Sequence, residues 1–170
     1  NPPDVVEIVE MVTPPINVGE VLIDVEAAAI NPAHLLTLQG NYGVQPKLPA
    51  VPGAEGIGKV ISVGRDVSNV KEGDRVMIPP YTGTWRQQVV VPAKSITVKF
   101  PTAGDLVQMA MLMANPPTAW LLLKTVVQLK PGDWVIQNAA NSAVGQYVIQ
   151  LAHIYGYHTV NVVRREGLYD

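Results

Sequence analysis

The sequence contains no cysteine among its 170 residues. This absence excludes disulfides, catalytic thiolates, and zinc or iron–sulfur sites built on cysteine. Charged residues are also scarce, at 15% of the chain, and the formal net charge is −2 with no run of like charges. The chain therefore has neither the basic surface that nucleic-acid binding requires nor a polybasic patch for a membrane.

Long apolar runs are missing as well. No stretch approaches the roughly 20 apolar residues that span a bilayer, and the opening residues NPPDVVEIVE lack the basic and apolar regions of a signal peptide. With 48% hydrophobic residues, the chain can still bury a sizeable core. We therefore expect a soluble globular protein with no nucleic-acid or membrane partner.

The first hundred residues read as short β-strands separated by glycine and proline. The expected strand segments are VVEIV (5–9), EVLIDVEAAAI (20–30), IGKVISVG (57–64), DRVMI (74–78), WRQQVVV (85–91) and SITVK (95–99). Such a series predicts an antiparallel barrel or sandwich, which we place at residues 1–103.

From residue 104 the pattern becomes helical and then alternates between strand and helix. DLVQMAMLMA (105–114) and TAWLLLKTVVQL (118–129) are expected helices, with Asn115-Pro116-Pro117 as the break between them. A strand over 133–138, a helix over 143–155 capped by Gly156, and a strand over 158–163 form one βαβ unit, whose strands must be parallel. The chain is thus α/β, with a second domain beginning at residue 104.

The turn of the βαβ unit carries a degenerate dinucleotide-binding pattern. With the last glycine of GxGxxG placed on Gly145, the stretch NAANSAVGQ reads AxSxxG, with Ala140 at the tight turn and Ser142 at the pyrophosphate. Small side chains there allow backbone N–H groups to approach a phosphate. The same turn also suits the packing of any buried βαβ unit, so the pattern alone leaves both interpretations open.

The strand after this helix ends in NVVRRE rather than in the carboxylate that binds the ribose hydroxyls of NAD. The guanidinium groups of Arg164 and Arg165 suit the 2′-phosphate of NADP, although a solvated arginine pair after a strand would look the same. We therefore expect NADPH rather than NADH.

Several stretches together resemble one family: the zinc-independent medium-chain dehydrogenases/reductases, and among them the mitochondrial-type 2-enoyl thioester reductases. They are INPAHLLTLQGNYG (30–43), LPAVPGAEGIGKVISVG (48–64), GTWRQQVVV (83–91), NPPTAW (115–120), QNAANSAVGQYVIQLA (137–152) and NVVRRE (161–166). The resemblance implies a GroES-like β domain at 1–103 and the first part of a Rossmann NADP-binding domain at 104–170. It also implies a chain about twice as long, so the present one is expected to be truncated.

The resemblance further implies that NADPH reduces the double bond of a trans-2-enoyl thioester linked to coenzyme A or acyl carrier protein. The tyrosine of GNYG, here Tyr42, would supply the proton, because a phenolic hydroxyl keeps its proton at neutral pH. The cofactor-binding positions that it implies are Asn115, Asn141, Ser142, Ala143, Val144, Gly145, Arg164, Arg165 and Glu166. Without the family, Tyr42 would be an ordinary loop residue and Asn115 a helix cap.

The resemblance also implies a homodimer, cytoplasmic in bacteria or in the mitochondrial matrix in eukaryotes. Ala54 replaces the histidine of the zinc-binding branch and there is no cysteine, so no metal is expected; the three scattered histidines, His34, His153 and His158, are expected to be structural. Two alternatives remain: a quinone reductase of the same superfamily, which needs no tyrosine donor, and a non-catalytic half that pairs with another subunit.

Overall fold

The computed structural model describes residues 4–168, which form two compact units. The first ends at Met111 and the second begins at Leu112. This boundary lies later than the expected one after Ala103, because helix α2 (Leu106–Ala110) contacts strands β1 and β2 of the first unit.

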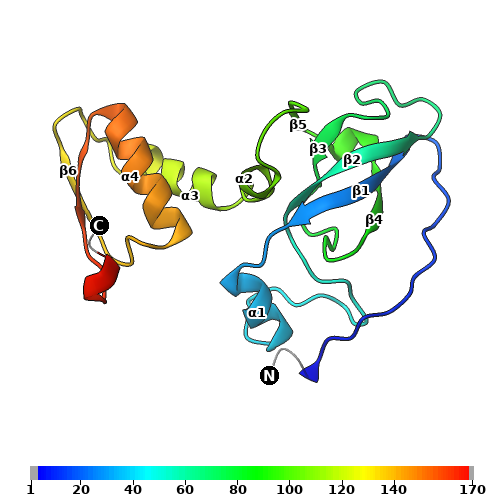
Figure 1. Ribbon diagram of the computed structural model, residues 1–170, viewed down its shortest axis with the longest axis horizontal. Helices are drawn as coiled ribbons and strands as arrows, with labels where there is room; N and C mark the ends of the chain where they lie inside the picture. Colours follow the sequence, from blue (N-terminus) through cyan, green and yellow to red (C-terminus); the bar gives the residue numbers. More distant parts are fainter. Residues whose placement is uncertain (1–3, 169–170) are drawn as a thin grey trace. The chain divides into compact units, whose positions relative to one another are not determined.

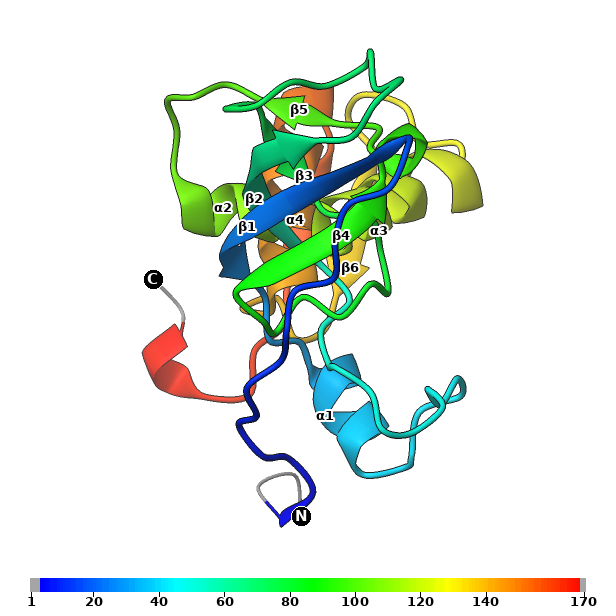
Figure 2. The same cartoon turned by 90° about the vertical axis from the view of Figure 1, so that its right-hand side faces the viewer.

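The first unit is built on one antiparallel sheet in the order β4-β1-β2-β3-β5 (Figure 1). Its strands are β1 (Glu20–Ala28), β2 (Gly56–Val63), β3 (Arg75–Met77), β4 (Gln88–Pro92) and β5 (Lys99–Phe100). Alternate residues of β1 point into the core, with Val21 and Ile23 fully buried. Figure 2 shows β4 alongside β1, where Ile23 lies opposite Val89. The β-rich character predicted for this region is therefore confirmed.

Two details of the strand prediction are wrong. Residues 5–9 form no strand; Val5, Ile8 and Val9 are exposed, and no described strand pairs with them. Of the expected strand over 95–99 only Lys99 belongs to a strand, β5, and Ser95 lies in a 3₁₀ turn, η2 (Ala93–Ser95). A β-rich sequence forms a strand only where a neighbour supplies a ladder of hydrogen bonds.

The second unit contains the expected βαβ arrangement. Strand β6 (Trp134–Gln137), helix α4 (Ala143–Tyr155) and strand β7 (His158–Asn161) follow in order, and β6 and β7 pair in parallel. Gly156 ends α4 in the left-handed conformation, with φ 72°, as predicted. The pairing of β7 continues as far as the Val162 N–H, which donates to Gln137 O at 2.9 Å.

Helix α3 (Asn115–Leu121) packs against α4 and continues into a π-helical turn, η3 (Leu122–Val126). Ala119, Leu123, Val148 and Ala152 form their common core. The expected break at Asn115-Pro116-Pro117 is instead the first turn of α3, where proline is tolerated because the N–H groups there lack helical acceptors. Helix α1 (Pro32–Leu38) and the 3₁₀ turn η4 (Glu166–Leu168) complete the described elements.

Candidate functional site

The turn between β6 and α4, together with the first turn of α4, holds five of the predicted cofactor-binding residues. Ser142 is the N-cap of α4, and its Oγ accepts a hydrogen bond from the Gly145 N–H at 3.1 Å. The N–H groups of Ala143 and Val144 lie in the first helical turn, where no intrahelical acceptor exists. Such a turn presents backbone donors and the positive end of the helix dipole to an anion.

Gly145 brings the start of α4 close to the preceding turn. A Cβ atom at this position would lie 2.5 Å from the carbonyl oxygen of Ala140 and 2.8 Å from its carbonyl carbon. Ala140 is itself buried. Only glycine fits here, which is the packing demand that the third glycine of a dinucleotide-binding turn meets.

Ala140 lies within the turn, as the sequence suggests, because the Ser142 N–H donates to Ala139 O at 2.8 Å across it. The positive φ of the turn, 49°, falls on Ala139, one residue earlier. The N–H of Ala140 donates to the carbonyl of Val162 at 3.3 Å, which joins the turn to the end of β7. Arg164 and Arg165 follow two and three residues later and are exposed, and Glu166 begins η4. The turn and the arginine segment thus come from adjoining parts of the second unit.

Asn115 also belongs to the second unit, as the first residue of α3. Ala114 occupies the N-cap position of this helix, so the alternative role of Asn115 as a cap is wrong. The side chain of Asn115 is half-buried.

Tyr42 lies in the first unit, in the loop that follows α1. Its side chain is 38% exposed, and its carbonyl oxygen accepts a hydrogen bond from Gln45 Nε2 at 2.9 Å. The helix before it ends in a Schellman motif, in which the Gly40 N–H donates to Thr37 O and the Asn41 N–H to Leu36 O. Tyr42 therefore follows directly on a fixed helix end.

A buried polar cluster in the first unit was not predicted from the sequence. Glu55, just before β2, is fully buried, and its Oε1 accepts a hydrogen bond from Asn31 Nδ2 at 2.5 Å. The side chain of Thr84 donates to Glu55 O at 3.0 Å. A signal was available: a single carboxylate inside the apolar, glycine-rich stretch AVPGAEGIG has to find polar partners if that stretch is buried.

His34 completes this cluster. Backbone N–H groups of Asn31 and Ala54 lie 3.1 Å from its Nδ1 and Nε2 respectively, and a neutral imidazole can accept one such bond at a time while an imidazolium accepts none. Burial lowers the pKa of His34, against the opposing charge of Glu55. Residues 4–168 hold no group of three or more His, Asp or Glu side chains placed to bind a metal.

Trp85 also joins the cluster. Its ring meets that of His34 edge-on, with centroids 5.6 Å apart, and its Nε1 donates to Ala29 O at 3.2 Å. Trp85 therefore packs within the buried cluster.

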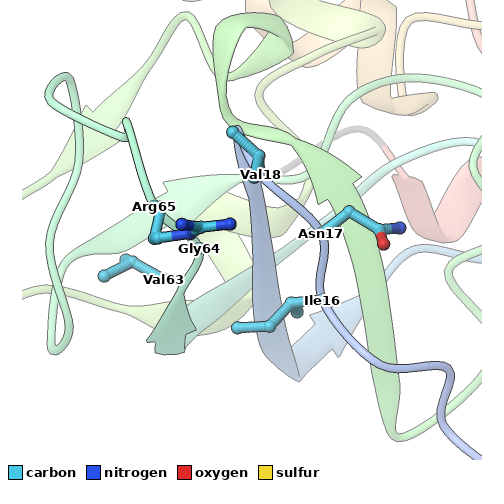
Figure 3. A pocket seen from close by; sticks show the side chains of 6 residues that line it. All are labelled: Ile16, Asn17, Val18, Val63, Gly64 and Arg65. Atoms are coloured by element: carbon cyan, nitrogen blue, oxygen red, sulfur yellow. The ribbon is translucent and has the colours of Figure 1, made fainter.

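Each unit carries a hollow on its surface. One in the first unit is shown in Figure 3 and is lined by Ile16, Asn17, Val18, Val63, Gly64 and Arg65. One in the second unit is largely apolar and is lined by Leu112, Pro116, Pro117, Trp120, Tyr147 and Leu151. No predicted site residue lines either hollow.

Among the described residues, no helix has the length and apolar character needed to cross a bilayer.

Several known proteins that are similar in sequence to this chain carry the same name, mitochondrial enoyl-[acyl-carrier-protein] reductase. The mitochondrial enoyl-[acyl-carrier-protein] reductase of Caenorhabditis elegans is 47% identical over 170 residues, which cover 96% of this chain and 48% of the relative. The chain thus spans about half the length of the curated relatives it matches.

Solved structures of 2-enoyl thioester reductases and of a quinone oxidoreductase are also similar to this chain. The mitochondrial 2-enoyl thioester reductase Etr1p/Etr2p heterodimer from Candida tropicalis matches with a TM-score of 0.83 and 28% identity, over 91% of this chain and 48% of that one. The complex of Etr1p with NADP and crotonyl-CoA matches with a TM-score of 0.81 and 28% identity, over 88% and 47%. The quinone oxidoreductase of Thermus thermophilus, also solved with NADPH, matches with a TM-score of 0.79 and 28% identity, over 95% and 50%.

A family comparison matches residues 17–102 to the alcohol dehydrogenase GroES-like domain. This range contains all five strands of the first unit, together with α1 and the Tyr42 loop. The parallel β6–α4–β7 arrangement of the second unit is the start of a Rossmann-like sheet. The chain belongs to the alcohol dehydrogenase GroES-like domain family.

Proposed function

We propose that this protein acts in the NADPH-dependent reduction of the 2,3 double bond of a trans-2-enoyl thioester. The observation that carries the proposal is the 47% identity, along nearly the whole chain, to a relative named as an enoyl reductase. A second support is the similarity to Etr1p, which was solved with NADP and with crotonyl-CoA, itself a 2-enoyl thioester.

In this proposal Tyr42 is the proton donor. Bound NADPH supplies the hydride that adds to the β-carbon of the substrate. The negative charge that develops on the thioester carbonyl and the α-carbon needs a proton, which a phenolic O–H can donate or share in a hydrogen bond. Tyr42 lies on an exposed loop with its side chain 38% accessible, which leaves its hydroxyl available to a ligand.

The cofactor is assigned to the second unit. Asn141, Ser142, Ala143, Val144 and Gly145 are proposed to bind the pyrophosphate, and Asn115 the nicotinamide side. The tight approach of Gly145 to Ala140 fits this use, because the third glycine of a dinucleotide-binding turn allows this close packing. Arg164 and Arg165, with Glu166 beside them, are proposed to lie around the adenosine phosphate.

The quinone reductase remains the second candidate, favoured by the similarity to the Thermus thermophilus enzyme. The two functions share the cofactor site but differ in their need for a proton donor at Tyr42. We further propose a homodimer, with the Etr1p/Etr2p pair as support for assembly in twos. Because the enoyl reductase relatives are named mitochondrial, we propose the mitochondrial matrix if the protein is eukaryotic, and the cytoplasm if it is bacterial.

The test is the loss of NADPH absorbance when the purified protein, from its full reading frame, meets a trans-2-enoyl-coenzyme A. NADH and a quinone are run in parallel. We expect turnover only with NADPH and the thioester, and a loss of at least 100-fold in kcat for Tyr42→Phe, within the range of general acid catalysis. Tyr81→Phe, which changes another exposed tyrosine of the same unit, is the matched control. Turnover with the quinone alone would move the function to the second candidate.

The absence of any turnover would instead support the non-catalytic half. In that case the purified protein would neither bind NADPH nor consume it with either substrate.

A further inference from the structure

Helix α1, which leads to the Tyr42 loop, has no fully buried apolar side chain. His34 is its one buried side chain, while Leu35 and Leu36 are each 41% exposed. The helix lies beyond the end of the sheet in both views (Figures 1 and 2). A helix of this length is not stable alone and needs contacts elsewhere to fix it. The one buried side chain lies in its first turn, whereas Leu38 in its last turn is only half-buried.

The first turn of α1 is fixed by polar contacts to the buried cluster. Asn31 is the N-cap residue, and its Nδ2 donates to the fully buried Glu55 carboxylate. The Asn31 N–H donates to His34 Nδ1, so the cap and the third helical residue are tied to each other. Hydrogen bonds to a charged acceptor are about twice as strong as neutral ones, which makes this contact the firmest hold on the helix start.

Glu55 is itself held in place by the sheet unit. Its carbonyl oxygen accepts from Thr84 Oγ1 at 3.0 Å and from the Ala29 N–H at 3.4 Å. Ala29 follows β1 directly, and Glu55 precedes β2 directly. The carboxylate is therefore placed by two central strands and can act as a fixed reference point for α1.

The position of the far end of α1 determines where the Tyr42 loop begins. A seven-residue helix rises about 10 Å, and the Schellman motif of Gly40 and Asn41 fixes the direction in which the chain leaves it. Tyr42 is the next residue. A tilt of the helix at its first turn would thus displace Tyr42 by an amount that grows along the helix.

We propose that Asn31 and Glu55 are positioning residues, which hold the Tyr42 hydroxyl in place through α1. The expected effect on turnover rests on the function proposed above, whereas the expected effect on the loop does not. It assigns the buried carboxylate a task beyond stability: the Asn31–Glu55 contact sets where the proton donor lies. A substrate-free readout of the loop can therefore test it separately from catalysis.

The experiment uses Asn31→Ser, which keeps a good N-cap side chain but is too short to reach Glu55. The first readout is hydrogen exchange at the Gly40 and Asn41 N–H groups in the full-length protein. We expect exchange there to become about tenfold faster. Asp105→Ala, which removes the N-cap of α2 in the same unit, is the matched control and should leave exchange at these two groups unchanged.

The second readout is turnover in a double-mutant cycle with Tyr42→Phe. Asn31→Ser should lower kcat about tenfold, leave KM for NADPH unchanged, and cause no further loss when Tyr42 is already phenylalanine. Glu55→Gln, which retains an oxygen acceptor for Asn31, should restore most of the activity relative to Glu55→Ala. If Asn31→Ser does not fold, Gly40→Ala disturbs the other end of α1 at an exposed position with φ 73°, and the same loss and the same non-additivity are expected.

The outcomes separate the two proposals. Unchanged exchange at Gly40 and Asn41, or an equal loss of kcat in the Tyr42→Phe background, would overturn the positioning role. A third outcome is that Asn31→Ser speeds exchange while Tyr42→Phe leaves the protein fully active. That outcome would support the role of Asn31 in fixing the loop and refute Tyr42 as the proton donor.

Discussion

Replacing Gly145 by alanine tests the close approach of α4 to the turn before it. In an open helix this change would stabilise the protein by about 1 kcal/mol, because alanine has the higher helix propensity. Here the new Cβ would lie 2.5 Å from Ala140 O and 2.8 Å from Ala140 C and Cα, which are all backbone atoms and cannot rotate away. Overpacking of this kind costs about 1–3 kcal/mol, and three backbone contacts place the cost at the upper end, roughly 3 kcal/mol. The expected net loss is about 2 kcal/mol.

The assay is thermal unfolding of the purified protein followed by circular dichroism. For a chain of this size a loss of 2 kcal/mol lowers Tm by roughly 4–8 °C. Gly43→Ala is the matched control, because a Cβ there meets nothing within 4 Å and its φ is not in the left-handed region; its Tm should stay the same or rise slightly. A Tm for Gly145→Ala equal to or above that of the wild type would refute the tight packing of this turn.

Three further predictions concern other residues. Burial lowers the pKa of His34 below its value in the unfolded chain, near 6.5. As the pH falls, the unfolded chain therefore takes up this proton before the folded protein does. The contribution of His34 to the free energy of unfolding should be complete above about pH 6.5 and be lost as the pH drops through the folded pKa. Urea unfolding at pH 7.5 and 5 checks this, and a pH slope that persists in His34→Gln would contradict it. Ser142→Ala should lower the unfolding free energy by about 1 kcal/mol through loss of the cap, whereas Ser142→Asp should keep stability but weaken NADPH binding by charge repulsion, measured by fluorescence titration. Arg164→Ala should raise KM for NADPH about tenfold or more and leave KM for NADH unchanged; equal changes for both cofactors would exclude contact with the 2′-phosphate.

The secondary structure of the second unit could be predicted from the sequence because each of its signals is short-range. The start of α4 at Ala143, its end at Gly156 and the parallel strands on either side follow from a cap, a glycine and a change of period that all lie within the same thirty or so residues. Even so, the positive φ at Ala139, 49°, was not predicted. A turn with small residues at every position does not reveal which one adopts positive φ.

The parts that could not be predicted depend on contacts between distant segments. The run at residues 5–9 has strand composition but finds no described partner, and no local signal distinguishes it from the run that forms β1. The hydrogen bond between Asn31 and Glu55 joins residues 24 positions apart. Neither residue type by itself predicts that the other is its partner. The role of Tyr42 was suggested by resemblance to a family, not by its own surroundings.

The sheet order also sets when the protein can fold during synthesis. Strand β1 is central, and one of its two neighbours, β4, ends at Pro92, with Ile23 opposite Val89. Because chains emerge from the ribosome from the N-terminus onward, β1 must wait with one edge unpaired until residues 88–92 have appeared. The β6–α4–β7 unit, by contrast, closes soon after its last residue is made, since its strands are joined by one helix. A pause in translation before residue 88 would therefore expose β1 to chaperones or to aggregation, while a pause after residue 162 would not.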